Sequence, residues 1–177
     1  MFTKYSIHFL TGCKRFDIIK VEGIISFEEV FYMTVYNTIL VAVDGSDASK
    51  KALQKAVEVA NNYEAKLGIT HVIDTSAYSP NIVLNTNFDK AEQYAKELLL
   101  ELKEMAEEAG AKEVETHLDY GSPKAKITKQ IAKNYHVDLI VVGATGLNAV
   151  ERFLIGSVSE HIVRHADVDV LVVRWDK

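Results

Sequence analysis

Cysteine is nearly absent from this sequence, which has a single one, Cys13, in 177 residues. One cysteine can form no intramolecular disulfide framework, and it cannot build a cysteine-based metal site. No apolar run approaches the length of about 20 residues that spans a bilayer. The N-terminal residues also lack the order of basic start, apolar run and small-residue cleavage site of a signal peptide. These absences fit a reducing compartment, and we expect the protein in the cytoplasm.

Clusters of basic residues are missing as well. Lys and Arg number 20 against 25 Asp and Glu, which gives a formal net charge of −5. A mildly acidic chain without a basic run offers no electrostatic footprint for the phosphates of nucleic acid or for anionic lipid. We therefore expect neither nucleic acid nor a membrane as a partner.

Several motifs of catalysis are absent too. The sequence has no Gly-Lys-Ser/Thr P-loop, no G-x-G-x-x-G after its first expected strand and no G-x-S-x-G elbow. Without a lysine fixed over a transferring phosphate, a fast kinase or ATPase is disfavoured. His161 and His165 stand four residues apart, a spacing that can chelate a metal, but no third ligand is evident. We expect a solvated helix face there and no metal site.

What the sequence does contain, from Tyr36 onward, is an alternation of short apolar runs and longer segments of helical periodicity. One run, Val137–Val142, is almost continuously apolar, which is typical of a strand covered on both faces. The alternation predicts an α/β fold: a five-stranded parallel sheet, doubly wound with helices on both faces, Rossmann-like. The expected strands are Thr38–Asp44, Lys66–Asp74, Val114–Tyr120, Val137–Val142 and Val168–Arg174.

Four helices are expected between these strands. Ser46 or Asp47 caps the first, and Gly121-Ser122-Pro123 opens the third, which runs to about Tyr135. The fourth is Ser157–His165. The second has a heptad-like stripe of apolar residues, and Gly110 marks its expected end. Such a stripe also fits a coiled coil, but only about three repeats are present, which favours a helix with one face packed on the sheet. The apolar face of the first helix consists of Ala52, Leu53, Ala56, Val57 and Ala60. The apolar stripe of the second helix consists of Phe88, Ala91, Ala95, Leu98, Leu102, Met105 and Ala109. A loop is expected at Thr75–Asn87, before the second helix.

Two glycine-bearing segments carry the clearest chemistry. Val142 is followed by Gly143-Ala144-Thr145-Gly146, and nine residues later Gly156-Ser157-Val158-Ser159 opens a helix. In parallel sheets ligands lie beyond the carboxyl ends of the strands, and the first N–H groups of a helix form an anion site. Ser157 and Ser159 add hydroxyl donors and a contact for Mg²⁺. The glycines alone could merely turn the chain and Ser157 merely cap the helix, but their combined placement favours a phosphate ligand.

Two further residues stand at expected strand ends. Asp44 ends the first strand and could receive an adenine amino group or a metal, or it could simply form a turn with Gly45-Ser46. Val72, on the second strand, could be an apolar neighbour of a base or ordinary core. The strand-end position favours a functional role for Asp44, whereas the two readings of Val72 are nearly balanced.

Thr38–Arg174 resembles the universal stress protein family. The stretches ILVAVDGSDAS, HVID and VDLIVVGATG…RFLIGSVSEHIVRHADVDVLVVR carry the resemblance, and the family's ATP signature G-x2-G-x9-G-[ST] is complete. The resemblance implies an adenine nucleotide alpha hydrolase-like fold, ATP with or without Mg²⁺, and a homodimer through the last strand, Val170–Arg174. Asp167-Val168-Asp169 departs from many relatives, which have proline and cysteine there. The resemblance also implies which residues contact each part of ATP. Adenine would contact Val43, Asp44 and Val72, and ribose would contact the loop that comprises Val142, Gly143 and Gly146. The phosphates would contact Gly156, Ser157, Val158 and Ser159.

The resulting expectation is an ATP-binding regulatory or protective protein of the stress response. Two alternatives stay open. One is an enzyme, either a slow ATPase or a relative of adenine-nucleotide hydrolases, although the missing lysine and base count against more than slow hydrolysis. The other is a structural interaction module with no bound nucleotide.

Residues 1–35 stand outside the alternating pattern, and we expect them to be an N-terminal extension of a universal stress protein domain at 36–177. The ordered pattern begins just after Met33. Translation could start at that methionine, in which case residues 1–32 derive from an upstream start, or the segment could be a genuine N-terminal arm. The sequence leaves both readings open.

Overall fold

The computed structural model describes residues 3–6, 16–20, 32–75, 86–146 and 155–174. The chain divides into two compact units, Met1–Tyr36 and Asn37–Lys177. The first contains an antiparallel sheet in the order β1-β2-β3, made of β1 (Thr3–Ser6), β2 (Phe16–Lys20) and β3 (Tyr32–Thr34). The sequence pattern had predicted no strands there.

The second unit is built on a five-stranded parallel sheet. Its strands are β4 (Thr38–Ala42), β5 (Lys66–Ile73), β6 (Val114–Tyr120), β7 (Leu139–Gly143) and β8 (Asp169–Val173). Their order is β6-β5-β4-β7-β8, with every neighbouring pair parallel. The predicted fold class is confirmed. The chain leaves β4 toward one edge, then returns to β7 and proceeds toward the other, so the order reverses between β4 and β7.

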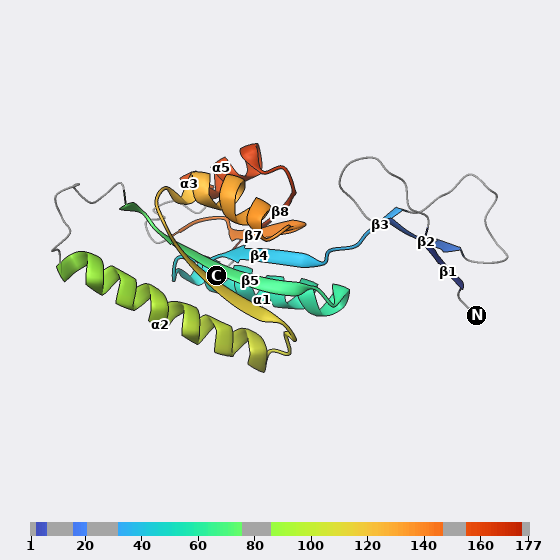
Figure 1. The fold of residues 1–177 in the computed structure, drawn as a ribbon, viewed down its shortest axis with the longest axis horizontal. Coiled ribbons are helices and arrows are strands. Elements are labelled where there is room, and N and C mark those ends of the chain that lie inside the picture. Colours follow the sequence, from blue (N-terminus) through green and yellow to red (C-terminus); the bar gives the residue numbers. More distant parts are fainter. Residues whose placement is uncertain (1–2, 7–15, 21–31, 76–85, 147–154, 175–177) are drawn as a thin grey trace. The chain divides into compact units, whose positions relative to one another are not determined.

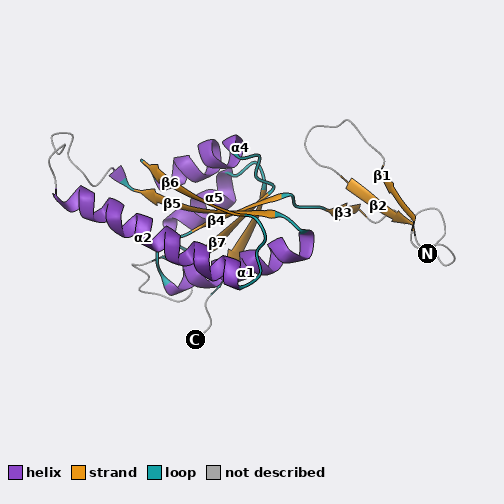
Figure 2. Cartoon of the chain, turned by 60° about the horizontal axis from the view of Figure 1, so that its bottom comes forward, coloured by secondary structure: helices purple, strands orange, loops and turns teal. Residues whose placement is uncertain are grey.

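Right-handed crossovers dictate which helices cover which face of this sheet. The steps from β4 to β5 and from β5 to β6 pass through α1 (Asp47–Tyr63) and α2 (Thr86–Glu108), which contact each other on one face. The steps to β7 and β8 run in the opposite direction, so their helices cover the other face. Figures 1 and 2 show helices on both sides of the sheet.

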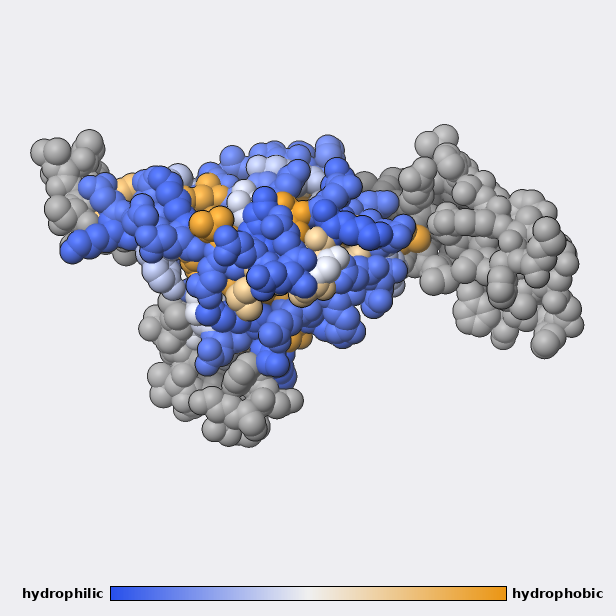
Figure 3. All heavy atoms as spheres, turned by 90° about the horizontal axis from the view of Figure 1, so that it is seen from below, coloured by the Kyte–Doolittle hydropathy of each residue, from blue (hydrophilic) through white to orange (hydrophobic). Residues whose placement is uncertain are grey.

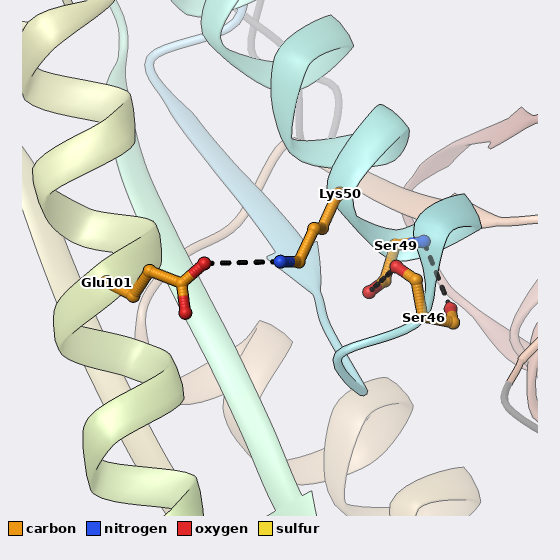
Figure 4. A network of polar contacts seen from close by, with 4 residues as sticks. All are labelled: Ser46, Ser49, Lys50 and Glu101. Atoms are coloured by element: carbon orange, nitrogen blue, oxygen red, sulfur yellow. Dashed lines mark hydrogen bonds and ion pairs between the residues drawn. The ribbon is translucent and has the colours of Figure 1, made fainter.

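Helix α1 forms where its sequence pattern predicts. The side chain of Ser46 accepts a hydrogen bond from the N–H of Ser49 and caps the helix, and Glu64 in the left-handed conformation ends it. All five residues of its predicted apolar face are buried. Lys50 reaches across to Glu101 of α2 with an N–O distance of 3.2 Å (Figure 4).

Helix α2 differs from its prediction at both ends. It begins at Thr86, so the last two residues of the expected loop are helical, while residues 76–85 lie outside the described ranges. Ala109, assigned to the apolar stripe, follows the helix and is exposed. Leu99 and Ala106 are buried although they are not in the stripe. The buried face is wider than a heptad seam because the helix packs on a sheet.

The helix after β6 is not the regular helix that was expected. It comprises α3 (Pro123–Ala125), a π-helical segment η2 (Lys126–Ile131) and α4 (Ala132–Asn134). The next helix, α5 (Ser157–His165), has the predicted bounds. Ile127, Ile131 and Ile162 from these helices form one buried cluster with Leu40, Val72, Ile140 and Val142 of the sheet. In the described ranges, no helix is long and apolar enough to span a bilayer.

Candidate functional site

The turn between β4 and α1 is organised around the carboxylate of Asp44. Its Oδ1 accepts hydrogen bonds from the N–H and the hydroxyl of Ser46, at 3.0 and 2.6 Å. Gly45 has φ +85°, a conformation that side chains disfavour, and this sharp turn leads directly into α1. The turn and cap reading of this segment is therefore observed, and the same hydrogen bonds fix Asp44 just after the central strand.

The ladder between β4 and β5 ends at Val43. The N–H of Val43 donates to the carbonyl of Thr70 at 2.9 Å. The carbonyl of Val43 instead lies 2.8 Å from Nδ1 of the His71 ring. The next residue along β5, Val72, therefore lies beyond the last backbone hydrogen bond between β4 and β5, where the chain turns away from the sheet at Asp44.

The loop after β7 lies against this turn. A Cβ added to Gly146 would lie 2.6 Å from Oδ2 of Asp44, so the absence of a side chain lets the loop approach the carboxylate. The N–H of Gly156 donates to the carbonyl of Ala144 at 2.6 Å. The two halves of the glycine motif, separated by nine residues in sequence, are thus joined at the reversal point of the sheet, where ligands bind in such folds.

Gly143 has a packing reason for its missing side chain. A Cβ there would lie 2.9 Å from the backbone carbon and oxygen of Ala48, so α1 could not approach β7 as closely. We expected this glycine to expose the backbone to a ribose, whereas the direction that its Cβ would take is filled by α1. Any ligand contact of Gly143 would have to involve its main chain.

Ser159 is also used within the fold. Its hydroxyl, in a buried residue, donates to the carbonyl of Gly143 at 2.7 Å. Because this proton is committed to Gly143, a phosphate contact of Ser159 would use its main-chain N–H. Ser157 is exposed at the helix start, so its hydroxyl remains accessible to a ligand.

The N-terminus of α5 has the form of an anion site. Gly156 is the N-cap residue, and no side chain caps the helix. The first main-chain hydrogen bond of the helix is donated by Glu160 to Gly156. The N–H groups of Ser157, Val158 and Ser159 precede that bond and add to the positive end of the helix dipole.

The valines at these strand ends are buried. Val43, Val72 and Val142 are 5, 8 and 3% exposed, and the last two belong to one core cluster that does not include Val43. Ala42 remains partly exposed although it lies on the central strand, where the three preceding residues are buried. Ala42 packs against the same core cluster, but it is less completely covered there than the residues before it. Its small side chain gives no sequence signal of this difference in burial.

Other residues at the site were not identified from the sequence. The hydroxyl of Tyr94, on α2, would lie 2.5 Å from a Cβ on Gly45, so α2 reaches the turn that holds Asp44. Lys126 pairs with Asp119 at 3.3 Å, and Asp119 is the register partner of Val72 on β6. These contacts join segments far apart in sequence, and no local pattern marks them. Arg152, which lies between the two glycine-bearing segments in the sequence and could reach a phosphate or solvent, is outside the described residues.

The sequence suggested Mg²⁺ as the companion of ATP, with Asp44 as a further candidate metal contact. Within the described ranges, no three His, Cys, Asp or Glu side chains are gathered in a way that could hold a metal. Mg²⁺ commonly binds through substrate phosphates and water with one or two protein ligands. The residues present fit an ion that is carried by phosphates, with the exposed hydroxyl of Ser157 as a candidate contact.

Comparison with known proteins gives a consistent result. A sequence model described as Universal stress protein family matches residues 35–174. A Staphylococcus aureus (strain USA300) protein that carries the universal stress protein name is 51% identical over 146 residues, covering 82% of this chain and 88% of its own. The structure of universal stress protein UspA from Lactobacillus plantarum aligns with a TM-score of 0.74 and 35% identity, over 80% of this chain and 100% of that one.

Two similar structures contain adenine nucleotides. One is a universal stress protein in complex with cAMP, with a TM-score of 0.60 and 29% identity over 79% of this chain and 98% of that one. The other is a universal stress protein from Archaeoglobus fulgidus in complex with dAMP, with a TM-score of 0.61 and 25% identity over 80% of this chain and 100% of that one.

Proposed function

This chain belongs to the universal stress protein family, and from that premise we propose that it binds ATP, with or without Mg²⁺. The site lies at the carboxyl ends of β4, β5 and β7, and the bound protein acts as a regulatory or protective module of the stress response in the cytoplasm. We assign this function to residues 36–177 and give residues 1–35 no part in it.

The observation that carries the proposal is the hydrogen bond from Gly156 to Ala144, which sets the start of α5 beside the strand-end loop. A nucleotide has three chemically different parts, and the site offers a suitable group for each. The apolar residues Val43 and Val72 suit a base, with Asp44 as an acceptor for its amino group. The loop from Gly143 to Gly146 suits the ribose, and the N–H groups at Gly156–Ser159 suit the phosphates.

Adenine nucleotides in two related structures support the same ligand class. The choice of ATP within that class rests on the full motif of Gly143, Gly146, Gly156 and Ser157, together with the helix start. A triphosphate brings more negative charge to the dipole than a monophosphate does, and each hydrogen bond to a charged group contributes about 1.5–3 kcal/mol.

Calorimetry with ATP on the natural protein and on Gly156→Val tests the proposal. Gly156 has φ −65° and ordinary distances to its neighbours, so other residues can occupy this position without backbone strain. The two methyl groups of a valine extend beyond the Cβ, which would already lie 3.5 Å from the Ala144 oxygen, and should displace the turn that aims the N–H groups. ATP should then bind at least roughly tenfold more weakly, which is about 1.4 kcal/mol. Ser157→Ala should have a smaller effect because the backbone donors remain.

Val163→Ala is the matched control. Val163 lies on the same helix with 49% exposure, and its truncation should leave ATP affinity unchanged. Equal affinity of folded Gly156→Val and the natural protein would remove the phosphate assignment. Failure of the natural protein to bind any adenine nucleotide would favour the structural interaction module instead.

The enzymatic alternative is tested by phosphate release. The absence of a P-loop lysine supports slow turnover at most. We expect hydrolysis to remain slow in the natural protein and in all variants; steady turnover at a rate useful to metabolism would replace the binding function with a catalytic one.

A further inference from the structure

His71 occupies an unusual position at the end of the β4–β5 ladder. Its residue lies on β5, and its ring Nδ1 is 2.8 Å from the main-chain carbonyl of Val43. A carbonyl can only accept a hydrogen bond, so Nδ1 carries the proton in this contact. The side chain of His71 thus donates to a main-chain carbonyl that would ordinarily accept from a main-chain N–H of the neighbouring strand.

The alternation of a parallel strand shows which backbone group has been displaced. Thr70 turns its carbonyl toward β4, where it accepts from Val43, and Ile73 turns its carbonyl toward β6, where it accepts from Gly121. Alternate residues of a strand face the same neighbour, so the N–H and carbonyl of Val72 face β4. In a continued ladder, the N–H of Val72 would donate to the carbonyl of Val43.

That rung is not formed. The register of β4 with β5 ends with Ala42 opposite Thr70, followed only by the single bond from Val43 to Thr70. The carbonyl of Val43 instead accepts from the imidazole of His71. The N–H and carbonyl of Val72 therefore face the β4 side beyond the last rung of the ladder, where Ala42 is partly exposed and the chain turns at Asp44.

We propose that His71 is a positioning residue for the nucleotide base: by holding the carbonyl of Val43, it keeps the main-chain N–H and carbonyl of Val72 available to the edge of adenine. This inference rests on the proposed function. Adenine presents a ring-nitrogen acceptor next to an amino donor, and one N–H with one carbonyl complements that pair. His71 itself touches no ligand and acts through the two valines.

A pair of substitutions separates the hydrogen bond from the shape of the ring. His71→Phe keeps a flat ring but has no donor, so the carbonyl of Val43 should turn to Val72 and close the ladder. ATP should then bind at least roughly tenfold more weakly, and exchange of the Val72 amide hydrogen in the nucleotide-free protein should slow at least about tenfold. His71→Asn retains a donor near the position of Nδ1 and should restore both values toward those of the natural protein.

Two controls accompany these variants. Thr70→Val alters a buried residue of the same strand without touching the contact, and it should leave ATP affinity and Val72 exchange unchanged. Inorganic tripolyphosphate should bind natural protein and His71→Phe equally, because the phosphate end of the site is not altered. In the natural protein, nitrogen NMR of His71 should show the proton on Nδ1; this measurement requires no variant to fold.

Unchanged ATP affinity and unchanged Val72 exchange in His71→Phe would overturn the inference, as would equal losses in His71→Phe and His71→Asn. A His71 ring protonated only at Nε2 would also overturn it. If the natural protein binds no adenine nucleotide, the proposed function fails, and the exchange of the Val72 amide still decides whether His71 holds the ladder open.

Discussion

Gly143 and Gly156 belong to one sequence motif, but their surroundings make them respond differently to substitution. A Cβ on Gly143 meets the backbone of Ala48 at 2.9 Å, whereas a Cβ on Gly156 meets its nearest neighbour at 3.5 Å. Gly143→Ala should lower the free energy of unfolding by about 1–3 kcal/mol, because the backbone of α1 must shift. Gly156→Ala should lower it by less than about 1 kcal/mol.

Urea denaturation of both variants, followed by circular dichroism, checks this difference. Equal losses of unfolding free energy in the two variants would mean that α1 can shift at little cost. The packing explanation of Gly143 would then be wrong. For the same reason, lost ATP binding in a Gly143 variant is informative only if the variant is shown to be folded.

His117 should make stability depend on pH. Burial lowers the pKa of its ring below the ordinary value of 6.5, against the opposing influence of Glu115 and Asp119. The ring packs on Tyr135 with centroids 3.9 Å apart. A lowered pKa means that the unfolded chain takes up this proton first, so the contribution of His117 is fully present above pH 6.5 and is lost as the pH falls toward the folded-state pKa.

The measurement is the free energy of unfolding between pH 7.5 and pH 5 for the natural protein and His117→Phe. One proton contributes at most about 1.4 kcal/mol per pH unit, and the natural protein should show the steeper loss of stability on acidification. Identical pH profiles would show that His117 does not titrate differently in the folded and unfolded chains.

At the scale of the element, the start of α1 couples helix stability to the site. The hydroxyl of Ser46 accepts from the N–H of Ser49 at 3.2 Å (Figure 4). The same hydroxyl donates to Oδ1 of Asp44 at 2.6 Å. Ser46→Ala should lower the free energy of unfolding by about 0.5–2 kcal/mol through loss of the cap. It should also weaken ATP binding, because the carboxylate of Asp44 loses one of its donors.

Ser46→Thr keeps the hydroxyl and should preserve both properties. Lys50→Ala removes the exposed ion pair with Glu101 from the first turn of the same helix and should change stability by less than about 1 kcal/mol. The measurements are denaturation and ATP calorimetry on the three variants. If Ser46→Ala lost stability but bound ATP as tightly as the natural protein, the coupling would be refuted.

At the scale of the whole molecule, we expect self-association at the β8 edge of the five-stranded sheet. The face that Figure 3 shows, on the side of α2, is mostly hydrophilic, and its hydrophobic spots are small and separate. Strand β8 ends the sheet, and all five of its residues are partly exposed. Its residues Val170, Leu171, Val172 and Val173 are apolar and partly exposed, and no strand of the described ranges pairs with its outer edge. Such an edge favours pairing with a second copy.

We accordingly predict a homodimer through Val170–Arg174. Val172→Lys should shift it toward monomer, because the interface would bury an unpaired charge. Light scattering over a range of concentrations measures the mass, and circular dichroism establishes that the variant is folded. A natural protein that stays monomeric at every concentration would contradict the prediction.

The sequence by itself determined the strands of the parallel sheet and their order along the chain. These five strands and α5 lie within two residues of their predicted bounds, and the buried face of α1 matches its pattern. Hydrophobic periodicity, caps and turn residues act over a few neighbouring positions, so helices and strands can be predicted from a single sequence. The spacing of the glycine motif likewise indicated a ligand site before any contact was known.

Only the tertiary structure decided what the individual residues of the site do. The packing of Gly143 on Ala48, the approach of Gly146 to Asp44 and the capture of the Val43 carbonyl by His71 each depend on the register of strands and helices far apart in sequence. The π-helical segment after Pro123 has no local signal either. Such contacts are fixed by the way whole elements pack, because close-packed interiors leave each backbone group few alternative partners.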